Sequence, residues 1–133
     1  MATDVTYLFG KSSSSDIFPR KICDTFTHLK IIDFQAWELK KLTGASFEKC
    51  TELEHLNLAS NTISEIADTT FLTTIALKDL NLNGNQLTNL PQNVFWHLKS
   101  LDTLNLNKNA VNLPALVFHN LTALNTINLE DCD

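Results

Sequence analysis

The chain has 133 residues, with 10 Lys and Arg against 15 Asp and Glu and a formal net charge of −5. This acidic balance without a basic run argues against a nucleic-acid partner, because binding to a phosphate backbone depends on clustered cations. The sequence after Met1 predicts neither a secretory leader nor a transmembrane helix, so we expect no membrane contact by this segment.

A 24-residue unit repeats along almost the whole chain, and its clearest copies carry the pattern Leu-x-x-Leu-x-Leu-x-x-Asn. In chain order, a degenerate copy spans 5–28, regular copies span 29–52, 53–76 and 77–100, a shorter copy spans 101–123, and a truncated start spans 124–133. In the degenerate copy the three apolar positions hold Val5, Leu8 and Gly10. Fixed-period similarity of this kind predicts a solenoid, so residues 1–133 form a single repeat array in this interpretation.

Each Leu-x-Leu core predicts a short strand whose alternate side chains point to opposite faces. We expect successive strands to stack in parallel about 4.8 Å apart. A second apolar column should fill the space behind the sheet, and its members are Cys23, Phe47, Phe71, Phe95 and Phe118. No unit buries its own apolar face, so each is expected to be covered only by its neighbours.

Asn61, Asn85 and Asn109 stand where the chain turns off each strand, and they predict a structural ladder of buried amides. Losing one such buried partner costs about 1–3 kcal/mol. Cys132 replaces Asn at the last copy, whereas Trp37 at the second copy is no substitute. The ladder is therefore expected to begin at Asn61.

The three cysteines, Cys23, Cys50 and Cys132, all fall on repeat-phase positions. Their placement predicts buried thiols that pack as small hydrophobic groups. The last copy stops in mid-unit with apolar residues uncovered, which favours the interpretation that the chain is part of a longer array.

The units resemble the typical 24-residue leucine-rich repeat, and 77–100 matches it nearly throughout. The matching residues there are Leu77, Leu80, Leu82, Asn85, Leu87, Leu90, Pro91, Phe95 and Leu98. The chain is similar to the ectodomains of Toll and Toll-like receptors and to secreted leucine-rich repeat proteins of insects. The resemblance implies an α/β solenoid with a curved parallel sheet and an irregular or short helical convex side.

The resemblance also implies a non-enzymatic, extracellular protein-recognition module, possessing no cofactor, that binds a protein through its concave face. Extracellular members usually close their ends with disulfide caps, and no such cysteine cluster stands in this sequence. An intracellular scaffold or adaptor, and hence a cytoplasmic location, therefore stays open as the alternative. Further repeats, or a homo- or hetero-oligomer, would enlarge the small concave surface.

Outward-facing strand residues are the candidates for contact with a partner. They are Asp33, Gln35, His55, Asn57, Asp79, Asn81, Asn83, Thr103, Asn105, Asn107, Lys108, Asn128 and Glu130. The column Asn57, Asn81, Asn105 and Asn128 has two interpretations: an amide ladder that reads a polar partner, or a common feature of Leu-Asn-Leu strands. The acidic members favour a partner with basic or amide-rich contacts.

The remaining motifs are few. Asn120-Leu-Thr is a candidate N-glycosylation triplet, although the repeat itself could produce it. The four histidines share no metal-ligand spacing, and no nucleophile elbow, P-loop or zinc-protease motif occurs, so we expect no metal site and no catalysis. Trp37 and Trp96 are expected to be packing or edge residues, and an exposed Trp37 would be a candidate contact.

Overall fold

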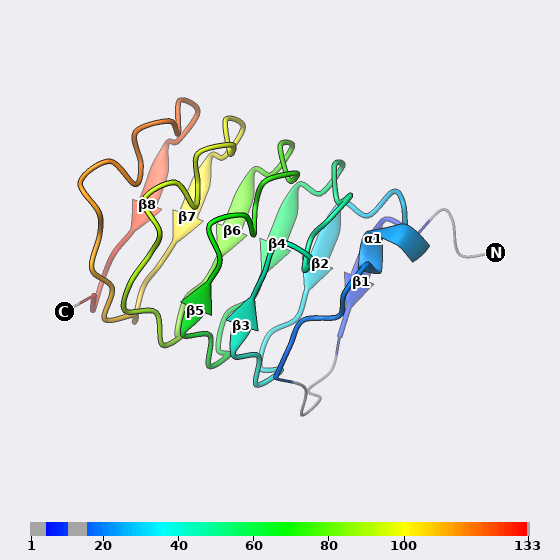
Figure 1. Cartoon of the computed structure of the whole chain (residues 1–133), viewed down its shortest axis with the longest axis horizontal. Helices are drawn as coiled ribbons and strands as arrows, with labels where there is room; N and C mark the ends of the chain where they lie inside the picture. Colours follow the sequence, from blue (N-terminus) through cyan, green and yellow to red (C-terminus); the bar gives the residue numbers. More distant parts are fainter. Residues whose placement is uncertain (1–4, 11–15, 133) are drawn as a thin grey trace.

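The computed structural model describes residues 5–10 and 16–132. Six short strands form one parallel sheet in the order β1-β2-β4-β6-β7-β8, with the chain ends at opposite ends of the stack (Figure 1). Their bounds are Tyr7–Phe9, Ile31–Asp33, His55–Asn57, Asp79–Asn81, Thr103–Asn105 and Thr126–Asn128. This confirms the expected solenoid with a parallel sheet.

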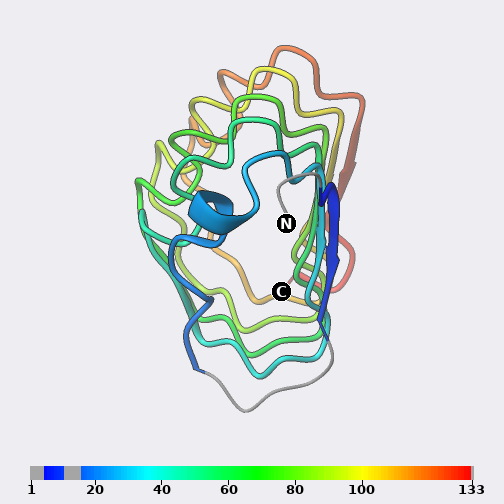
Figure 2. The same cartoon turned by 90° about the vertical axis from the view of Figure 1, so that its right-hand side faces the viewer.

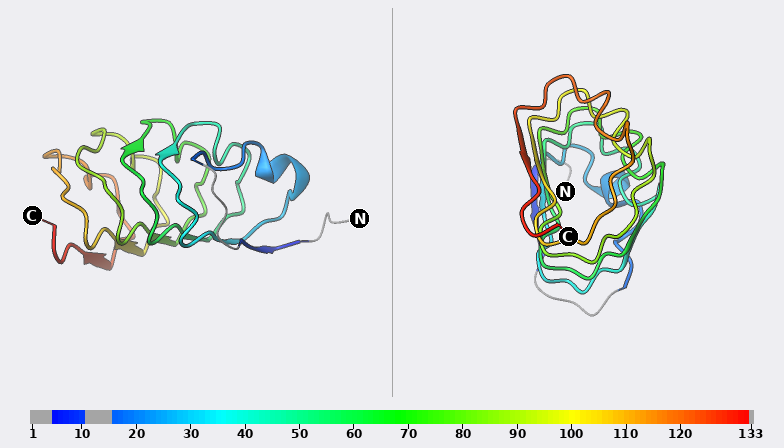
Figure 3. Two further views of the ribbon diagram at one scale, coloured as in Figure 1. Left: turned by 90° about the horizontal axis from the view of Figure 1, so that it is seen from below. Right: turned by 90° about the vertical axis from the view of Figure 1, so that its left-hand side faces the viewer.

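The chain winds one coil per repeat around an apolar interior. Viewed along the stack, the six-stranded sheet forms one side of each coil and the short helix α1 (Ile22–Thr25) lies on the opposite side (Figure 2). From below, the strands follow one edge of the molecule and the return segments follow the other (Figure 3). The return segments consist mostly of turns, as the repeat pattern predicts.

The register of the sheet follows the repeat frame. The middle residues of the strands align across the sheet as Leu8, Ile32, Leu56, Leu80, Leu104 and Ile127. Those of β2, β4, β6 and β7 are at most 2% exposed, whereas Ile127 on the edge strand β8 is 36% exposed. The difference arises because an edge strand has only one neighbouring unit to cover it.

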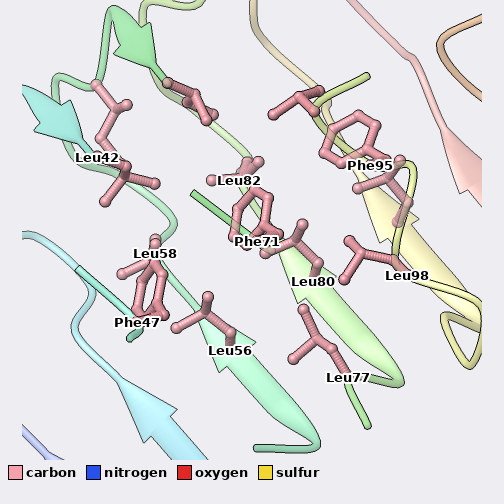
Figure 4. Close-up of a cluster of buried hydrophobic side chains, with 14 of the residues drawn as sticks. Leu42, Phe47, Leu56, Leu58, Phe71, Leu77, Leu80, Leu82, Phe95 and Leu98 are labelled. Atoms are coloured by element: carbon pink, nitrogen blue, oxygen red, sulfur yellow. The ribbon is translucent and has the colours of Figure 1, made fainter. Parts of the chain in front are cut away.

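The predicted phenylalanine column lies behind the sheet, where Phe47, Phe71 and Phe95 are fully buried (Figure 4). Successive rings stack with centroids 5.9, 6.1 and 6.3 Å apart, the last distance reaching the half-buried Phe118. At the start of the column Phe18 lies 4.6 Å from Phe47, so it supplies the ring that the first copy lacks at Cys23. Stacked aromatic pairs of this kind stabilise beyond their area burial by about 0.5–1.5 kcal/mol each.

A second, two-stranded parallel sheet, which the sequence analysis did not predict, joins β3 (Lys41–Leu42) to β5 (Glu65–Ile66). The Ala67 amide donates to the Leu42 carbonyl at 3.0 Å at its end. In the next unit the equivalent position is Pro91, which has no N–H to donate. The equivalent backbone hydrogen bond therefore cannot form between β5 and the next unit.

Among residues 5–10 and 16–132, no helix is both long and apolar enough to cross a membrane.

Candidate functional site: the concave face

The concave face is the outward side of the six-stranded sheet, and each strand gives it the first and third of its three residues. The first column holds Tyr7, Ile31, His55, Asp79, Thr103 and Thr126. The second column holds Phe9, Asp33, Asn57, Asn81, Asn105 and Asn128. The strand residues named from the sequence thus lie side by side in two rows.

The sequence analysis missed Tyr7 and Phe9, which lead these two columns and are 50% and 59% exposed. Both flank Leu8, and Leu8 pairs in register with Ile32. The spacing of the repeat places Tyr7 and Phe9 at outward positions. They were not predicted because the repeat pattern is weak around Gly10.

The asparagine column has a structural role that the sequence left undecided. The side-chain oxygens of Asn57, Asn81 and Asn105 accept the backbone N–H two residues further on, at 3.1, 3.0 and 3.0 Å. An N–H donor requires an acceptor, so this contact fixes which end of each amide points at the backbone. Within the described residues no hydrogen bond from the three Nδ2 groups is recorded. These three amides therefore keep their Nδ2 donors unpaired within the described residues.

Beyond the strand ends, the candidate residues lie in tight turns. Lys108 and Gly84 adopt left-handed backbone conformations, with φ of 56° and 67°. The Asn107 side-chain oxygen accepts the Glu130 N–H at 2.8 Å, so Asn107 links two turns. The Asn83 side-chain oxygen is buried without a partner in the described chain.

The ionisable strand residues of the concave face, Asp33, His55 and Asp79, lie on the three consecutive strands β2, β4 and β6. Gln35 donates through Nε2 to both Asp33 oxygens at 3.1 and 3.3 Å. His55 Nδ1 lies 2.5 Å from an Asp79 oxygen, with both side chains almost half exposed. A depression of about 260 Å³ is lined by Tyr7, Ile31, Ile32, Asp33, His55, Leu56, Asn57, Asp79 and Asn81.

Behind the face, Asn61, Asn85 and Asn109 form a chain of buried amides that joins adjacent units. Asn85 Nδ2 donates to the Leu58 carbonyl of the preceding unit at 3.0 Å and to the Leu82 carbonyl of its own at 2.9 Å. Its oxygen accepts the Ile63 N–H at 3.0 Å. These bonds hold the turns that carry the candidate contact residues.

The expectation of three buried thiols is wrong, because the two buried cysteines are bonded to each other and the free one is only half-buried. Cys23 and Cys50 form a disulfide with their Cα atoms 5.2 Å apart, whereas Cys132 is free and half-buried. The two bonded cysteines occupy different repeat columns in neighbouring units, and the winding of the chain brings these columns together. The Cys132 thiol donates to the Leu106 carbonyl at 3.0 Å.

Trp37 is half-buried and packs against the core, in agreement with the expectation of a packing residue. Its ring stacks on Phe34 with centroids 4.2 Å apart, and its backbone N–H donates to the Asn61 oxygen at 2.7 Å. Trp96 is 42% exposed and stacks on His119 at 6.3 Å.

Asn120 lies on the return segment, half-buried, and donates through Nδ2 to the Trp96 carbonyl at 2.7 Å. Leu121 is buried and Thr122 is exposed, so the middle residue of the triplet points inward.

No cluster of three or more His, Cys, Asp or Glu side chains with metal-binding geometry occurs in the described part of the chain. The concave face consequently offers amides, carboxylates and aromatic rings, a chemistry of contact and hydrogen bonding.

A leucine-rich repeat family model matches residues 51–111. A chain of the TLR13–ssRNA13 complex aligns with TM-score 0.90 and 26% identity, over 96% of this chain and 18% of that one. A chain of the Drosophila Toll–Spatzle complex aligns with TM-score 0.73 and 19% identity, over 97% of this chain and 27% of that one. No curated protein matches the sequence significantly.

This chain spans less than a fifth of the first neighbour's length and about a quarter of the second's. The first neighbour is complexed with single-stranded RNA, so this fold does not by itself exclude a nucleic-acid partner. The expectation of no nucleic-acid partner therefore depends on the charge of this chain alone. The repeat family and the first neighbour support a protein-interaction module, and the second neighbour supports the fold. Residues 51–111 thus match the leucine-rich repeat family model, and the chain has the solenoid fold and is similar in structure to the Toll and Toll-like receptor chains of these two complexes.

Proposed function

We propose that this chain is a non-enzymatic recognition module of an extracellular leucine-rich repeat receptor or secreted protein, and that it binds a protein partner through the concave face. The observation that carries the proposal is the second column of that face. Three of its asparagines, Asn57, Asn81 and Asn105, satisfy the backbone with their oxygens and leave their Nδ2 donors unpaired within the described residues. Unpaired donors on a fixed sheet suit the carbonyl acceptors of a polypeptide.

The size of the face supports action within a larger array. Six strands about 4.8 Å apart and three residues long, about 10 Å, give a projected area of roughly 300 Å². A standard interface takes about 800 Å² from each partner. Tight binding would therefore need additional repeats, or an oligomer, to complete the surface.

The Cys23–Cys50 disulfide supports the extracellular location. Disulfides persist in oxidising compartments and are rare in the cytosol. In denatured secreted protein a thiol titration is expected to find one reactive group, Cys132. Three reactive thiols in the native host compartment would instead favour the cytoplasmic scaffold.

Glycosylation at Asn120 provides a separate test of the same location. We expect secreted protein from eukaryotic cells to carry one N-glycan, seen as a mass increment that Asn120→Gln removes. A chain that reaches the medium without this increment would remove glycosylation from the proposal and leave the thiol result to decide the compartment.

Binding through the concave face is tested by site-directed photo-crosslinking. The crosslinking amino acid p-benzoyl-phenylalanine is placed at Asn105 on the concave face, or at the exposed Glu48 on the return segment as the matched control. With extracellular fluid of the source organism, protein adducts are expected from position 105 only. Equal adducts from both positions, or RNA adducts from position 105, would contradict the proposal.

A further inference from the structure

We propose that the depression at the β1 end of the concave face receives a basic side chain, arginine or lysine, of the protein partner. This inference rests on the proposed function, because it names the chemistry of the partner that the concave face would bind. The depression is called the aromatic-acidic depression below, and its lining includes Tyr7, Asp33, His55 and Asp79.

One side of the depression is aromatic. Tyr7 lines it directly, and Phe9 lies two residues further along β1, in register with Asp33. Both rings are at least half exposed, although large aromatic side chains usually find cover in a folded protein. A cation placed over such a ring is attracted by its negative face, and arginine and lysine are the cations that proteins bring.

The other side carries two carboxylates. In the described structure Asp33 is bonded to the neutral amide of Gln35, and Asp79 is bonded to His55 on the adjacent strand. The lining of the depression thus contains two carboxylates and no Lys or Arg. The six strands of the sheet contain no Lys or Arg, so no basic residue of the strands themselves neutralises them.

Basic residues around the sheet do not reverse this balance. Lys30 and Lys78 precede β2 and β6, but Glu54 and Asp102 hold the equivalent places before β4 and β7, and Lys78 pairs with Glu54 at 3.5 Å. Lys108 lies at the far end of the face, where its N–H donates to the Glu130 carbonyl. The local charge is therefore negative, and the complementary ligand is a cation.

The size and surroundings favour a peptide side chain. A volume of about 260 Å³ is below the range of drug-sized pockets, so it suits one long side chain. The Nδ2 groups of Asn57 and Asn81 lie beside the depression and can donate to backbone carbonyls of the same peptide. Aromatic ring, carboxylates and amide donors together fit a basic residue within a polypeptide segment.

The test is an NMR titration of the full chain with acetyl-Gly-Arg-Gly-amide at low ionic strength, where exposed charges are least screened. Amide shifts are expected to concentrate in β1, β2, β4 and β6 and to saturate. The matched probe replaces arginine with citrulline, which keeps the shape and loses the charge. Equal shifts with citrulline, or no saturable shifts with arginine, would overturn the proposal.

Two variants localise the effect, and a third controls for net charge. Asp33→Asn and Tyr7→Ala are each expected to raise the dissociation constant about two- to fivefold, in line with exposed ion pairs and cation–π contacts. Glu48→Gln removes the same charge from the exposed return segment and is expected to leave binding unchanged. If Asp33→Asn and Glu48→Gln weaken binding equally, general electrostatic attraction explains the result and the depression is not the site.

The outcome is separable from that of the proposed function. Concave-face adducts with a partner, together with no arginine binding, would sink only this inference. Arginine binding in the depression without concave-face adducts would instead contradict the proposed function and leave the side-chain site intact.

Discussion

Replacing Asn61 with alanine should destabilise the fold more than replacing Asn85, although the two residues hold equivalent places in the ladder. Asn85→Ala leaves the Ile63 N–H without its partner. The three carbonyls that Asn85 contacts each keep another donor. Asn61 also donates to Leu58, Asn109 also donates to Leu82, and the Ser60 N–H donates to Asn83. Only one buried group is then orphaned, at a cost of about 1–3 kcal/mol.

Asn61 stands at the start of the ladder, where this sharing ends. Its oxygen accepts the N–H groups of Trp37 and Leu39 at 2.7 and 3.1 Å. Its Nδ2 is the recorded donor to the Phe34 carbonyl at 2.9 Å, in a unit that has Trp37 where the others have asparagine. Asn61→Ala thus orphans three groups, and we expect it to cost about 2 kcal/mol or more beyond Asn85→Ala.

The assay is urea unfolding followed by circular dichroism, with the free energy of unfolding extrapolated to water for both variants. Asn109→Ala is the internal control, because its three carbonyls also keep other donors, from Asn85, Cys132 and the Gly84 N–H. It should therefore resemble Asn85→Ala. Equal losses at positions 61 and 85 would refute the reasoning that shared acceptors decide the cost.

Three further outcomes follow from the packing and bonding. Reducing the Cys23–Cys50 disulfide, which closes a separation of 27 residues, should lower the free energy of unfolding by about 3–4 kcal/mol, and Cys132→Ser should leave that reductant effect unchanged in urea titrations. Phe71→Ala should lower the free energy of unfolding by about 3–5 kcal/mol, whereas Leu72→Ala at the adjacent exposed position should change it by no more than about 0.5 kcal/mol. Equal losses of stability in thermal unfolding would contradict the role of the phenylalanine column as the core. Asn81→Ala should cost about 1 kcal/mol through the lost N–H contact of Asn83, and Asn81→Asp should cost less because its oxygen remains; the reverse order would show that the turn does not depend on that acceptor.

The sequence predicted the sheet because its signal is periodic. The Leu-x-Leu cores recur in phase, so the inward residues of β2, β4, β6 and β7 follow from spacing alone. The phenylalanine column follows for the same reason. The half-buried position of Trp37 was also predictable, since a bulky ring at a ladder position next to Phe34 can stack on it.

The disulfide was not predicted, because Cys23 and Cys50 are not equivalent in the repeat. The repeat shows which residues align from one unit to the next. It does not show which residues at different positions of neighbouring units come into contact when the chain folds. The second sheet was missed because β3 and β5 are two residues long, too short for a period-two pattern. The hydrogen-bond partner of each concave-face amide could not be predicted, because the repeat gives the positions of the side chains and not the atoms with which they bond.

The backbone contact made by the asparagine column bears on how this surface can evolve. The oxygen that closes each turn is common to asparagine and aspartate, so a single codon change can turn an outward donor into an acceptor while the turn keeps its bond. The column already contains both residue types, with Asp33 beside Asn57 in register. A lineage could thus invert the hydrogen-bonding polarity of this surface position by position, at little risk to the scaffold that displays it.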